Sequence, residues 1–188
     1  MKETIRTFIG IKITPEKKLA DLITDVKKSL KSEEIRWVDI NNLHLTLRFL
    51  GETSKKQIIE IIELLELISK QFQPFQFQLK GIAVFKNKNQ PRVLFISIEN
   101  DLILKQLAEA IQEKTDSLGF WIEQNNFNPH LTIGRIKYIQ NKDVFYSLIK
   151  KFSDVKIQQV TVSEIIFYQS ILSSEGPTYK PIKIVNLF

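Results

Sequence analysis

The stretches LHLTL (residues 43–47) and HLTI (residues 130–133) repeat one pattern, a histidine followed two positions later by a threonine. The 188-residue chain has two histidines, His44 and His130, and each stands in one of these stretches. Histidine titrates near neutral pH, so a matched pair of imidazoles is suited to acid–base chemistry. The repetition therefore predicts a fold with internal symmetry and a functional site where the two stretches meet.

Both stretches alternate between polar and apolar residues, which predicts strands. In a strand, successive side chains point to opposite faces, so His44, Thr46 and Arg48 are expected on one face. His130 and Thr132 are expected together for the same reason. The leucines and the isoleucine between them would point to the other face, into a core. Each strand thus offers an imidazole beside a hydroxyl, backed by hydrophobic packing.

Hydrophobic periodicity elsewhere in the chain predicts further strands and helices. Strands are expected at about residues 5–13, 75–85, 92–98, 155–168 and 179–185, in addition to the histidine strands at 43–50 and 131–137. Helices are expected from Thr14-Pro15, over 54–69, after the capping residue Asn100, and over 143–152.

The two halves of the chain share an order of elements. The first half contains a strand around Phe8, which precedes His44 by 36 positions. The second half contains a corresponding strand around Phe95, which precedes His130 by 35 positions. This order indicates an internal duplication, with two lobes that face each other across a central cleft containing both histidines. No flexible linker separates the halves, so residues 1–188 are predicted to form a single two-lobed domain.

The composition narrows the class of protein. With 43% hydrophobic and 26% charged residues the chain is typical of a soluble globular protein, and no apolar run reaches the roughly 18 residues that span a bilayer. No secretory signal is expected. Cysteine is absent, which excludes disulfides and thiolate chemistry, so a cytoplasmic location without membrane association is expected. The net charge of +6 modestly favours a polyanionic partner, and no obligate protein partner is indicated.

The residue types around the histidines exclude several kinds of chemistry. Neither histidine has a second His, Asp, Glu or Cys at the spacing of metal ligands, so no metal is predicted. A G-x-S-x-G elbow, a P-loop and a dinucleotide fingerprint are absent, so no cofactor is predicted. What remains is metal-free catalysis on a phosphodiester, in which one imidazolium protonates the leaving oxygen and one neutral imidazole activates the nucleophile. The threonine hydroxyls and an arginine would stabilise charge on the phosphate oxygens.

Longer stretches around the histidines carry a resemblance to a known family. They are RTFIGI (6–11), WVDINNLHLTLRFLG (37–51), PRVL (91–94), FNPHLTI (127–133) and VSEIIFYQSILSSEGPTY (162–179). The chain resembles the RNA 2',3'-cyclic phosphodiesterase family, also called 2'-5' RNA ligase, within the two-histidine phosphoesterase superfamily. The two H-x-T phrases together with these flanks are highly specific for that family.

The resemblance implies an α+β fold of two pseudo-symmetric lobes, each an antiparallel sheet with helices on its outer face, with a central cleft between them. It implies metal-independent hydrolysis of an RNA terminal 2',3'-cyclic phosphate to a 2'-phosphomonoester, together with reverse 2'-5' RNA ligation. The implied partner is an RNA or oligonucleotide with a 2',3'-cyclic phosphate end. Two alternatives stay open: a related phosphodiesterase acting on small cyclic nucleotides, and a non-catalytic nucleotide- or RNA-binding module.

The resemblance also implies roles for single residues. His44 matches the proton donor to the 3'-oxygen, and His130 matches the proton acceptor that activates water. Thr46 and Thr132 match hydroxyls that contact the phosphate. Candidates to stack on a nucleobase are the aromatic residues Phe8, Phe49, Phe127 and Tyr168.

Which arginine holds the phosphate depends on the strand geometry. Arg135 matches a basic residue that the family often places five positions after the second histidine. Strict alternation turns Arg135 away from His130, and a bulge at Gly134 would restore it to the cleft. Without that bulge, Arg48 is the better candidate.

Overall fold

The computed structural model describes residues 4–120, 127–174 and 176–188, and this part of the chain forms nine strands, four α-helices and one 3-10 turn. The strands are β1 (Thr4–Lys12), β2 (Glu34–Trp37), β3 (His44–Ser54), β4 (Phe75–Asn87), β5 (Gln90–Glu99), β6 (His130–Tyr138), β7 (Lys156–Val162), β8 (Glu164–Ser173) and β9 (Gly176–Asn186). The helices are α1 (Lys17–Ser29), α2 (Lys55–Ser69), α3 (Leu102–Asp116) and α4 (Lys142–Phe152), and the 3-10 turn is η1 (Ile40–Asn42).

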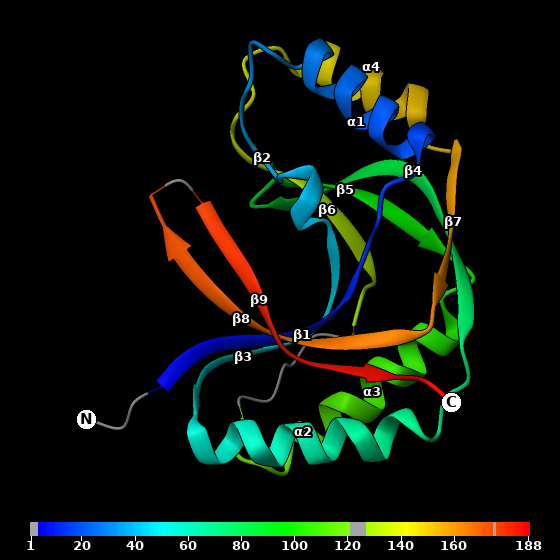
Figure 1. Cartoon of the computed structure of the whole chain (residues 1–188). Coiled ribbons are helices and arrows are strands. Elements are labelled where there is room, and N and C mark those ends of the chain that lie inside the picture. Colours follow the sequence, from blue (N-terminus) through cyan, green and yellow to red (C-terminus); the bar gives the residue numbers. More distant parts are fainter. Residues whose placement is uncertain (1–3, 121–126, 175) are drawn as a thin grey trace.

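The strands form two antiparallel sheets, one with the order β3-β1-β8-β9 and one with the order β2-β6-β5-β4-β7. Helices α2 and α3 cover the outer face of the four-stranded sheet, and α1 and α4 lie over the five-stranded sheet (Figure 1). The predicted α+β class, with two antiparallel sheets and helices on their outer faces, is confirmed. We call the two units the β3 lobe and the β6 lobe, after the strands that carry His44 and His130.

The lobes do not coincide with the two halves of the sequence. Strands β1 and β3 pair with β8 and β9 from the end of the chain, whereas the middle of the chain builds the β6 lobe together with β2. The helices that follow the first strand of each half also change lobe, because α1 contacts β7 and α3 contacts β3. The duplication therefore appears as two interleaved units, each completed by the other half of the chain.

Equivalent residues in the two lobes follow from the strand register. Gly10 is paired with Thr46, and Phe95 is paired with Thr132, so Gly10 and Phe95 occupy equivalent positions. Phe8 and Phe95, from which the two spacings were counted, are therefore two residues out of register with each other. A shift of two keeps every side chain on the same face, so the pattern of alternation could not reveal it.

The strand expected over residues 155–168 is two strands in different sheets. β7 pairs with β4 in one sheet and β8 pairs with β1 in the other, and the chain crosses between the lobes at Ser163. No glycine or proline marks this crossing, so the apolar pattern continues across it. Smaller differences concern the helix starts: α1 begins at Lys17 after the cap Glu16, and the residue that caps α3 is Asp101, since Asn100 has a φ of 60°.

The residues between the histidines and threonines lie in the core, as predicted. Leu45 and Leu131 are fully buried, and Leu47 and Ile133 are nearly so. Burial of each such side chain stabilises the fold by roughly 1.5–3 kcal/mol. The core therefore fixes the back of each histidine strand, and the polar face of each strand is turned toward the other lobe. Within the described residues, no helix is long and apolar enough to cross a membrane.

A buried glutamine holds the connection between β1 and α1 against the other lobe. The Gln158 side chain on β7 accepts a hydrogen bond from the Glu16 backbone N–H at 2.9 Å and donates one to the Thr14 carbonyl at 3.0 Å. Gln158 is 7% exposed, so its side-chain amide has little access to water. We expect Gln158→Leu to lower the free energy of unfolding by about 1–3 kcal/mol, because it removes both hydrogen bonds that join this connection to β7.

The matched control for this variant is Gln159→Leu, since Gln159 is the exposed neighbour and bonds only to the Gln76 side chain, at 2.9 Å. Its urea unfolding free energy should stay within about 0.5 kcal/mol of the parent. Equal effects of the two substitutions would contradict the role assigned to Gln158.

Candidate active site

The two lobes enclose a cleft of about 740 Å³ at the place where the histidine strands meet. Both histidines and both threonines of the repeated pattern line it. His44 and Thr46 come from β3, and His130 and Thr132 come from β6, so each lobe contributes one imidazole and one hydroxyl. The structure thus brings together the four residues that the repeated pattern singled out.

A bulge follows each threonine and controls which side chain next reaches the cleft. In β3, Leu47 has no partner on β1, because Thr46 is paired with Gly10 and Arg48 with Ile9. In β6, the same extra residue is Ile133. An extra residue reverses the alternation beyond it. The fourth residue after each histidine is therefore buried, and the fifth faces the cleft.

The expected bulge is present one position earlier, at Ile133 instead of Gly134, and Arg135 lines the cleft as it would require. Gly134 faces β2 at this point, where an ideal Cβ would lie 2.8 Å from the Ile35 side chain and 3.3 Å from the Trp37 ring. A larger residue would push β2 away from β6. The glycine therefore permits the close packing that accompanies the bulge, and Arg135 is the arginine brought beside the histidines.

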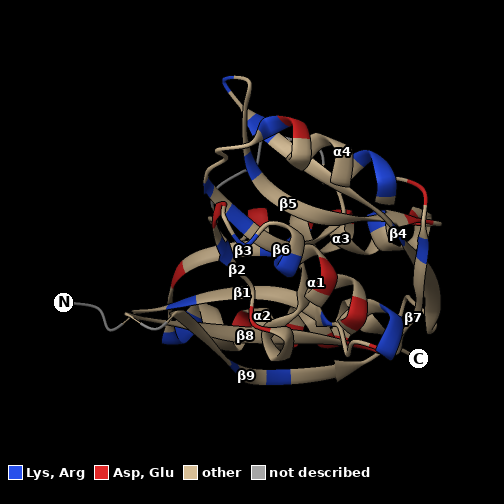
Figure 2. Cartoon of the chain, turned by 90° about the horizontal axis from the view of Figure 1, so that it is seen from above, with Lys and Arg blue, Asp and Glu red and all other residues tan. Residues whose placement is uncertain are grey.

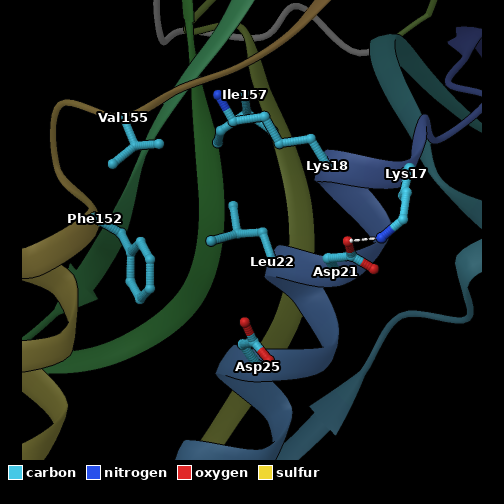
Figure 3. Close-up of a pocket in the computed structure, with 8 residues that line it drawn as sticks. All are labelled: Lys17, Lys18, Asp21, Leu22, Asp25, Phe152, Val155 and Ile157. Atoms are coloured by element: carbon cyan, nitrogen blue, oxygen red, sulfur yellow. Dashed lines mark hydrogen bonds and ion pairs between the residues drawn. The ribbon is translucent and has the colours of Figure 1, made fainter.

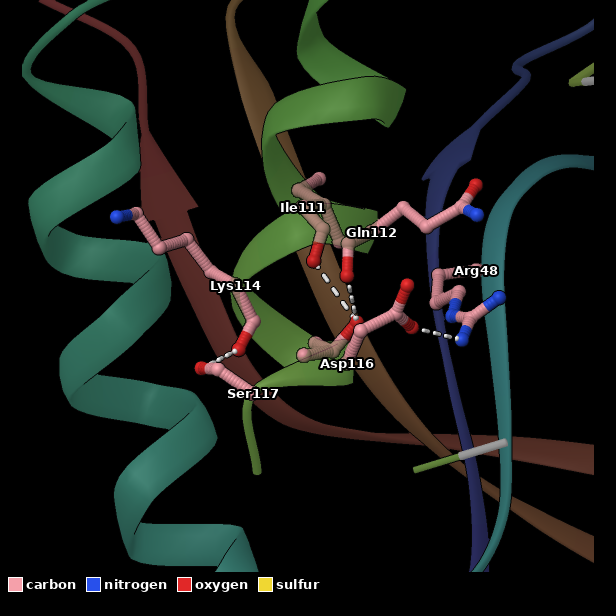
Figure 4. A network of polar contacts seen from close by, with 7 residues as sticks. Arg48, Ile111, Gln112, Lys114, Asp116 and Ser117 are labelled. Carbon is pink, nitrogen blue, oxygen red and sulfur yellow. Dashed lines mark hydrogen bonds and ion pairs between the residues drawn. The ribbon is translucent and has the colours of Figure 1, made fainter. Parts of the chain in front are cut away.

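Arg48 does not reach the cleft. Its side chain is 2% exposed and donates from Nη2 to Asp116 Oδ1 at 2.6 Å, at the end of α3 (Figure 4). The Thr115 hydroxyl of the same helix end bonds to the Ile111 and Gln112 carbonyls. The prediction that Arg48 shares a face with His44 and Thr46 was wrong, because the bulge at Leu47 was not foreseen. Arg48 joins β3 to α3 instead.

Each imidazole is held in one orientation by the backbone two residues before it. His44 Nδ1 lies 2.7 Å from the Asn42 carbonyl, and His130 Nδ1 lies 2.8 Å from the Asn128 carbonyl. A carbonyl oxygen only accepts hydrogen bonds, so Nδ1 carries the proton in both rings. Nε2 of each ring has no hydrogen-bond partner in the described part of the chain. Each Nε2 can therefore accept a proton when the ring is neutral and donate one when it is charged.

Aromatic rings support both imidazoles from the sheet below. Phe8 and Tyr179 contact His44, with ring centroids 5.0 and 4.8 Å away. Phe85 and Phe95 contact His130 in the other lobe, at 4.9 and 5.4 Å. The rings fix the imidazole planes and exclude water from one side of each.

This enclosure lowers the pKa of both histidines. Burial disfavours the imidazolium and moves the pKa of His44 below its ordinary value, while its backbone hydrogen bond acts in the opposite direction. The charges of Arg135 and His130 lower the pKa of His44 further. The pKa of His130 is lowered by burial and by Arg135 in the same way. The two rings and Arg135 therefore form one electrostatically coupled group.

The two threonine hydroxyls point into the same space. Thr46 and Thr132 are half-buried, and neither hydroxyl has a hydrogen-bond partner among the described residues. By contrast, the hydroxyl of buried Thr7 bonds to Thr53 at 2.6 Å. The hydroxyls of Thr46 and Thr132 are thus available to a ligand between the histidines.

Three further residues line the cleft to which the sequence analysis assigned no role in the site. Arg6 at the start of β1, Arg36 on β2 and Tyr179 on β9 also line it. Arg36 lies on a short strand whose pattern did not predict a strand, and the other two lie near the outer ends of longer strands. Of the four aromatic candidates for stacking on a nucleobase, Phe49 lines the cleft with 54% of its surface exposed. Phe8 also lines it but is buried beneath His44.

A second hollow lies on the outer side of the β6 lobe, between α1 and the segment that joins α4 to β7 (Figure 3). Leu22, Phe152 and Val155 form its floor, and a surface ion pair of 2.6 Å joins Lys17 to Asp21 at its rim. It contains neither histidine. Basic and acidic residues are both spread over the helices and strands of the described chain (Figure 2), and no group of three His, Asp or Glu side chains there is arranged to hold a metal ion.

The chain is similar to known phosphoesterases over most of its length. Residues 11–95 and 97–179 match the family described as LigT like Phosphoesterase. A relative from Methanocaldococcus jannaschii, named RNA 2',3'-cyclic phosphodiesterase, is 36% identical over 179 residues, which cover 95% of this chain and 99% of the relative.

Solved structures share the fold. The protein TT0787 of Thermus thermophilus superposes with a TM-score of 0.79 at 22% identity and covers 97% of this chain and 98% of its own. LigT of Escherichia coli, solved in complex with 3'-AMP, superposes with a TM-score of 0.73 at 22% identity and covers 98% of this chain and 99% of its own.

We expect Arg48→Ala to destabilise the protein by about 3 kcal/mol or more, because it removes a buried partner of Asp116 and leaves a cavity. Urea denaturation measures the effect. The control is Arg92→Ala, which removes an exposed arginine that donates to the Lys137 carbonyl at 3.3 Å and should change stability by less than about 0.5 kcal/mol. A stable Arg48→Ala protein would contradict the structural role of this pair.

We expect Arg135→Gln to raise the pKa of both histidines, because it removes a positive charge that disfavours each imidazolium. Proton–nitrogen NMR of the two rings during a pH titration measures both values, and the parent protein should titrate below 6.5 at each ring. Arg92→Gln is the control and should shift neither curve. Unchanged titration of both rings in Arg135→Gln would disprove the electrostatic coupling.

Proposed function

Because the chain belongs to the LigT-like phosphoesterase family, we propose that it hydrolyses the 2',3'-cyclic phosphate at an RNA end to a 2'-phosphomonoester. The observation that carries the proposal is the pair of Nε2 atoms, one from each lobe, that face one cleft beside two free hydroxyls. The name of the Methanocaldococcus jannaschii relative and the 3'-AMP in the Escherichia coli LigT complex support an RNA-end substrate.

In the proposed reaction the two imidazoles exchange protons with opposite sides of the phosphorus. Neutral His130 accepts a proton from water at Nε2 while the water oxygen bonds to phosphorus. The bond between phosphorus and the 3'-oxygen breaks, and His44 donates its Nε2 proton to that oxygen. The products are a 2'-phosphate and a free 3'-hydroxyl, and proton exchange with solvent restores the starting state of both rings.

The remaining polar groups act on the non-bridging phosphate oxygens. The hydroxyls of Thr46 and Thr132 donate hydrogen bonds, and the Arg135 guanidinium neutralises the charge that grows as water adds. A hydroxyl adds no positive charge, so it stabilises the phosphate without lowering the pKa of the imidazolium further. The anionic substrate itself raises the pKa of His44, which favours the charged acid once the cleft is filled.

The same geometry supports the reverse 2'-5' ligation. A 5'-hydroxyl of a second RNA takes the place of water, loses its proton to the same base and forms a 2'-5' phosphodiester. No additional residue is needed for that step. Hydrolysis dominates in this proposal because water is at far higher concentration than any 5'-hydroxyl end.

We further propose that residues 1–188 act as one folding unit in the cytoplasm. The exchange of strands and helices between the lobes supports one unit, because each sheet is built from strands of both halves of the sequence. The absence of cysteine in the sequence supports a reducing compartment.

The test is incubation with a short RNA ending in a 2',3'-cyclic phosphate, with EDTA present, followed by separation of the 2'- and 3'-phosphate products. We expect conversion to the 2'-phosphate alone. His44→Ala and His130→Ala should each lower kcat by about 100-fold or more, and Thr46→Val and Thr132→Val by about 10- to 100-fold.

Arg92→Gln serves as the surface control. A 3'-phosphate product would show that the 2'-oxygen leaves instead of the 3'-oxygen. Turnover of a cyclic mononucleotide with none of the RNA would favour the small-nucleotide enzyme, and tight binding without any product would favour the binding module.

A further inference from the structure

Three of the chain's five arginines line the cleft, although a single arginine suffices beside the reacting phosphate. They are Arg6, Arg36 and Arg135. All three are exposed, and no carboxylate of the described residues forms an ion pair with any of them. Buried Arg48, by contrast, is paired with Asp116. Guanidinium groups gathered in a concave site without counter-ions indicate an anionic ligand.

The described residues that line the cleft carry little negative charge. Among the described residues that line it, Asp39 is the one acidic residue, and its Oδ1 accepts the Asn41 backbone N–H at 2.8 Å. That carboxylate therefore caps the 3-10 turn η1. The charge of the arginines stays available to a bound molecule.

The three arginines do not act on the same groups. Arg135 lowers the pKa of both histidines, whereas Arg6 and Arg36 are not among the groups that shift either ring. All three act on Tyr179, whose pKa is raised by burial and lowered by their charges. Tyr179 contacts His44 at 4.8 Å. Of the three arginines, Arg135 therefore acts on both histidines, and Arg6 and Arg36 act on the Tyr179 ring that contacts His44.

Contacts across the lobes place Arg36 at one end of the cleft. Arg36 lies on β2 of the β6 lobe, and Gly176 lies on β9 of the β3 lobe. The two residues are close across the lobes, because an ideal Cβ on Gly176 would lie 3.4 Å from Arg36 Nη2. Asn42 Nδ2 donates to the Pro177 carbonyl at 3.1 Å and joins the 3-10 turn η1, which follows β2, to the same stretch of β9. Gly176 precedes Tyr179 by three positions, a distance of about 10 Å along a strand. The Arg36 guanidinium thus lies beside the strand segment that leads away from His44.

Arg6 approaches the same region from β1. It precedes Phe8 by two positions, so both side chains lie on the face of β1 turned to the cleft. Phe8 contacts His44 at 5.0 Å and Tyr179 at 5.0 Å. Arg6 therefore lies two residues, about 7 Å, along β1 from Phe8, the ring that supports His44. Two lobes contribute one arginine each, as they do for the histidines.

We propose that Arg6 and Arg36 form a second phosphate-binding site, which takes the phosphate on the 5'-oxygen of the nucleotide whose 2',3'-cyclic phosphate reacts. The inference rests on the proposed function. In an RNA ending in a cyclic phosphate, the next phosphate along the chain is bonded to that 5'-oxygen. The enzyme accordingly prefers an oligonucleotide, or a 5'-phosphorylated nucleotide, over a nucleoside cyclic phosphate with a free 5'-hydroxyl.

Binding of two product-like nucleotides to the intact protein tests the second site directly. Calorimetry compares adenosine 2'-monophosphate with adenosine 2',5'-bisphosphate, which differ only in the 5'-phosphate. The bisphosphate should bind the parent protein at least about tenfold more tightly, since hydrogen bonds to charged groups are worth that much. In the double variant Arg6→Gln Arg36→Gln the two affinities should agree within about twofold.

Arg92→Gln is the matched control and should keep the tenfold difference, and thermal melting establishes that each variant is folded. Equal binding of the two nucleotides by the parent protein would overturn the inference. Retention of the full difference in the double variant would overturn it equally.

Turnover of dinucleotides shows whether the second site takes the phosphate of an RNA linkage or a terminal 5'-phosphate. The same experiment tests the proposed hydrolysis independently of the second site. Two dinucleotides with 2',3'-cyclic phosphate ends are compared, one with a normal phosphodiester linkage and one with an uncharged methylphosphonate linkage. A kcat/KM at least about tenfold higher for the charged linkage identifies an oligonucleotide subsite. Equal values alongside a difference in nucleotide binding identify a site for a terminal 5'-phosphate. Nucleotide binding that discriminates the bisphosphate without turnover of any cyclic phosphate would support the second site and reject the proposed hydrolysis.

Discussion

One extra residue directly after the threonine of each histidine strand governs which side chains line the cleft. Beyond Leu47 and Ile133 the alternation of β3 and β6 reverses, so the fifth residue after each histidine faces the cleft and the fourth faces the interior. The histidines and threonines precede the bulge and are unaffected by it. The bulge thus permits each strand to present three positions to the cleft, at His, Thr and the fifth residue, while its apolar side chains still fill the core.

The two lobes use this shared backbone for different purposes. At the fifth position the β6 lobe presents Arg135, and the β3 lobe presents Phe49. At the fourth position the β6 lobe has Gly134 against β2, and the β3 lobe has Arg48 paired with Asp116 (Figure 4). The asymmetry places one positive charge beside two imidazoles and leaves an apolar ring opposite it. A symmetric pair of arginines would lower the pKa of both histidines further and make a charged acid harder to maintain.

The sequence predicted the parts of the fold that depend on local pattern. Alternation located the histidine strands and assigned Leu45 and Leu131 to the core, and the repeated phrase brought both histidines to one cleft. It also allowed for the bulge in β6, because Gly134 is a visible signal of irregular strand geometry. No glycine marks the equivalent place in β3, so Arg48 was assigned to the wrong face.

Features that depend on residues distant in the sequence could not be predicted from the local sequence pattern. The crossing at Ser163 has no turn residue, and the choice of sheet for β7 and β8 is made by pairing with β4 and β1. The cleft positions of Arg6 and Arg36 follow from how the lobes face each other. A basic residue near a strand end gives the same local signal whether solvent or a ligand surrounds it.

The interleaving of the lobes constrains how the chain acquires its structure during synthesis. Strand β1 leaves the ribosome well before its partner β8, which begins at residue 164. Until then β1 can pair only with β3, and one of its edges remains open to other strands. Pairing between such distant segments gives a high contact order and slow formation of the native topology. The arrangement that unites two histidines from a duplicated unit therefore delays completion of the cleft until β8 and β9 have been translated.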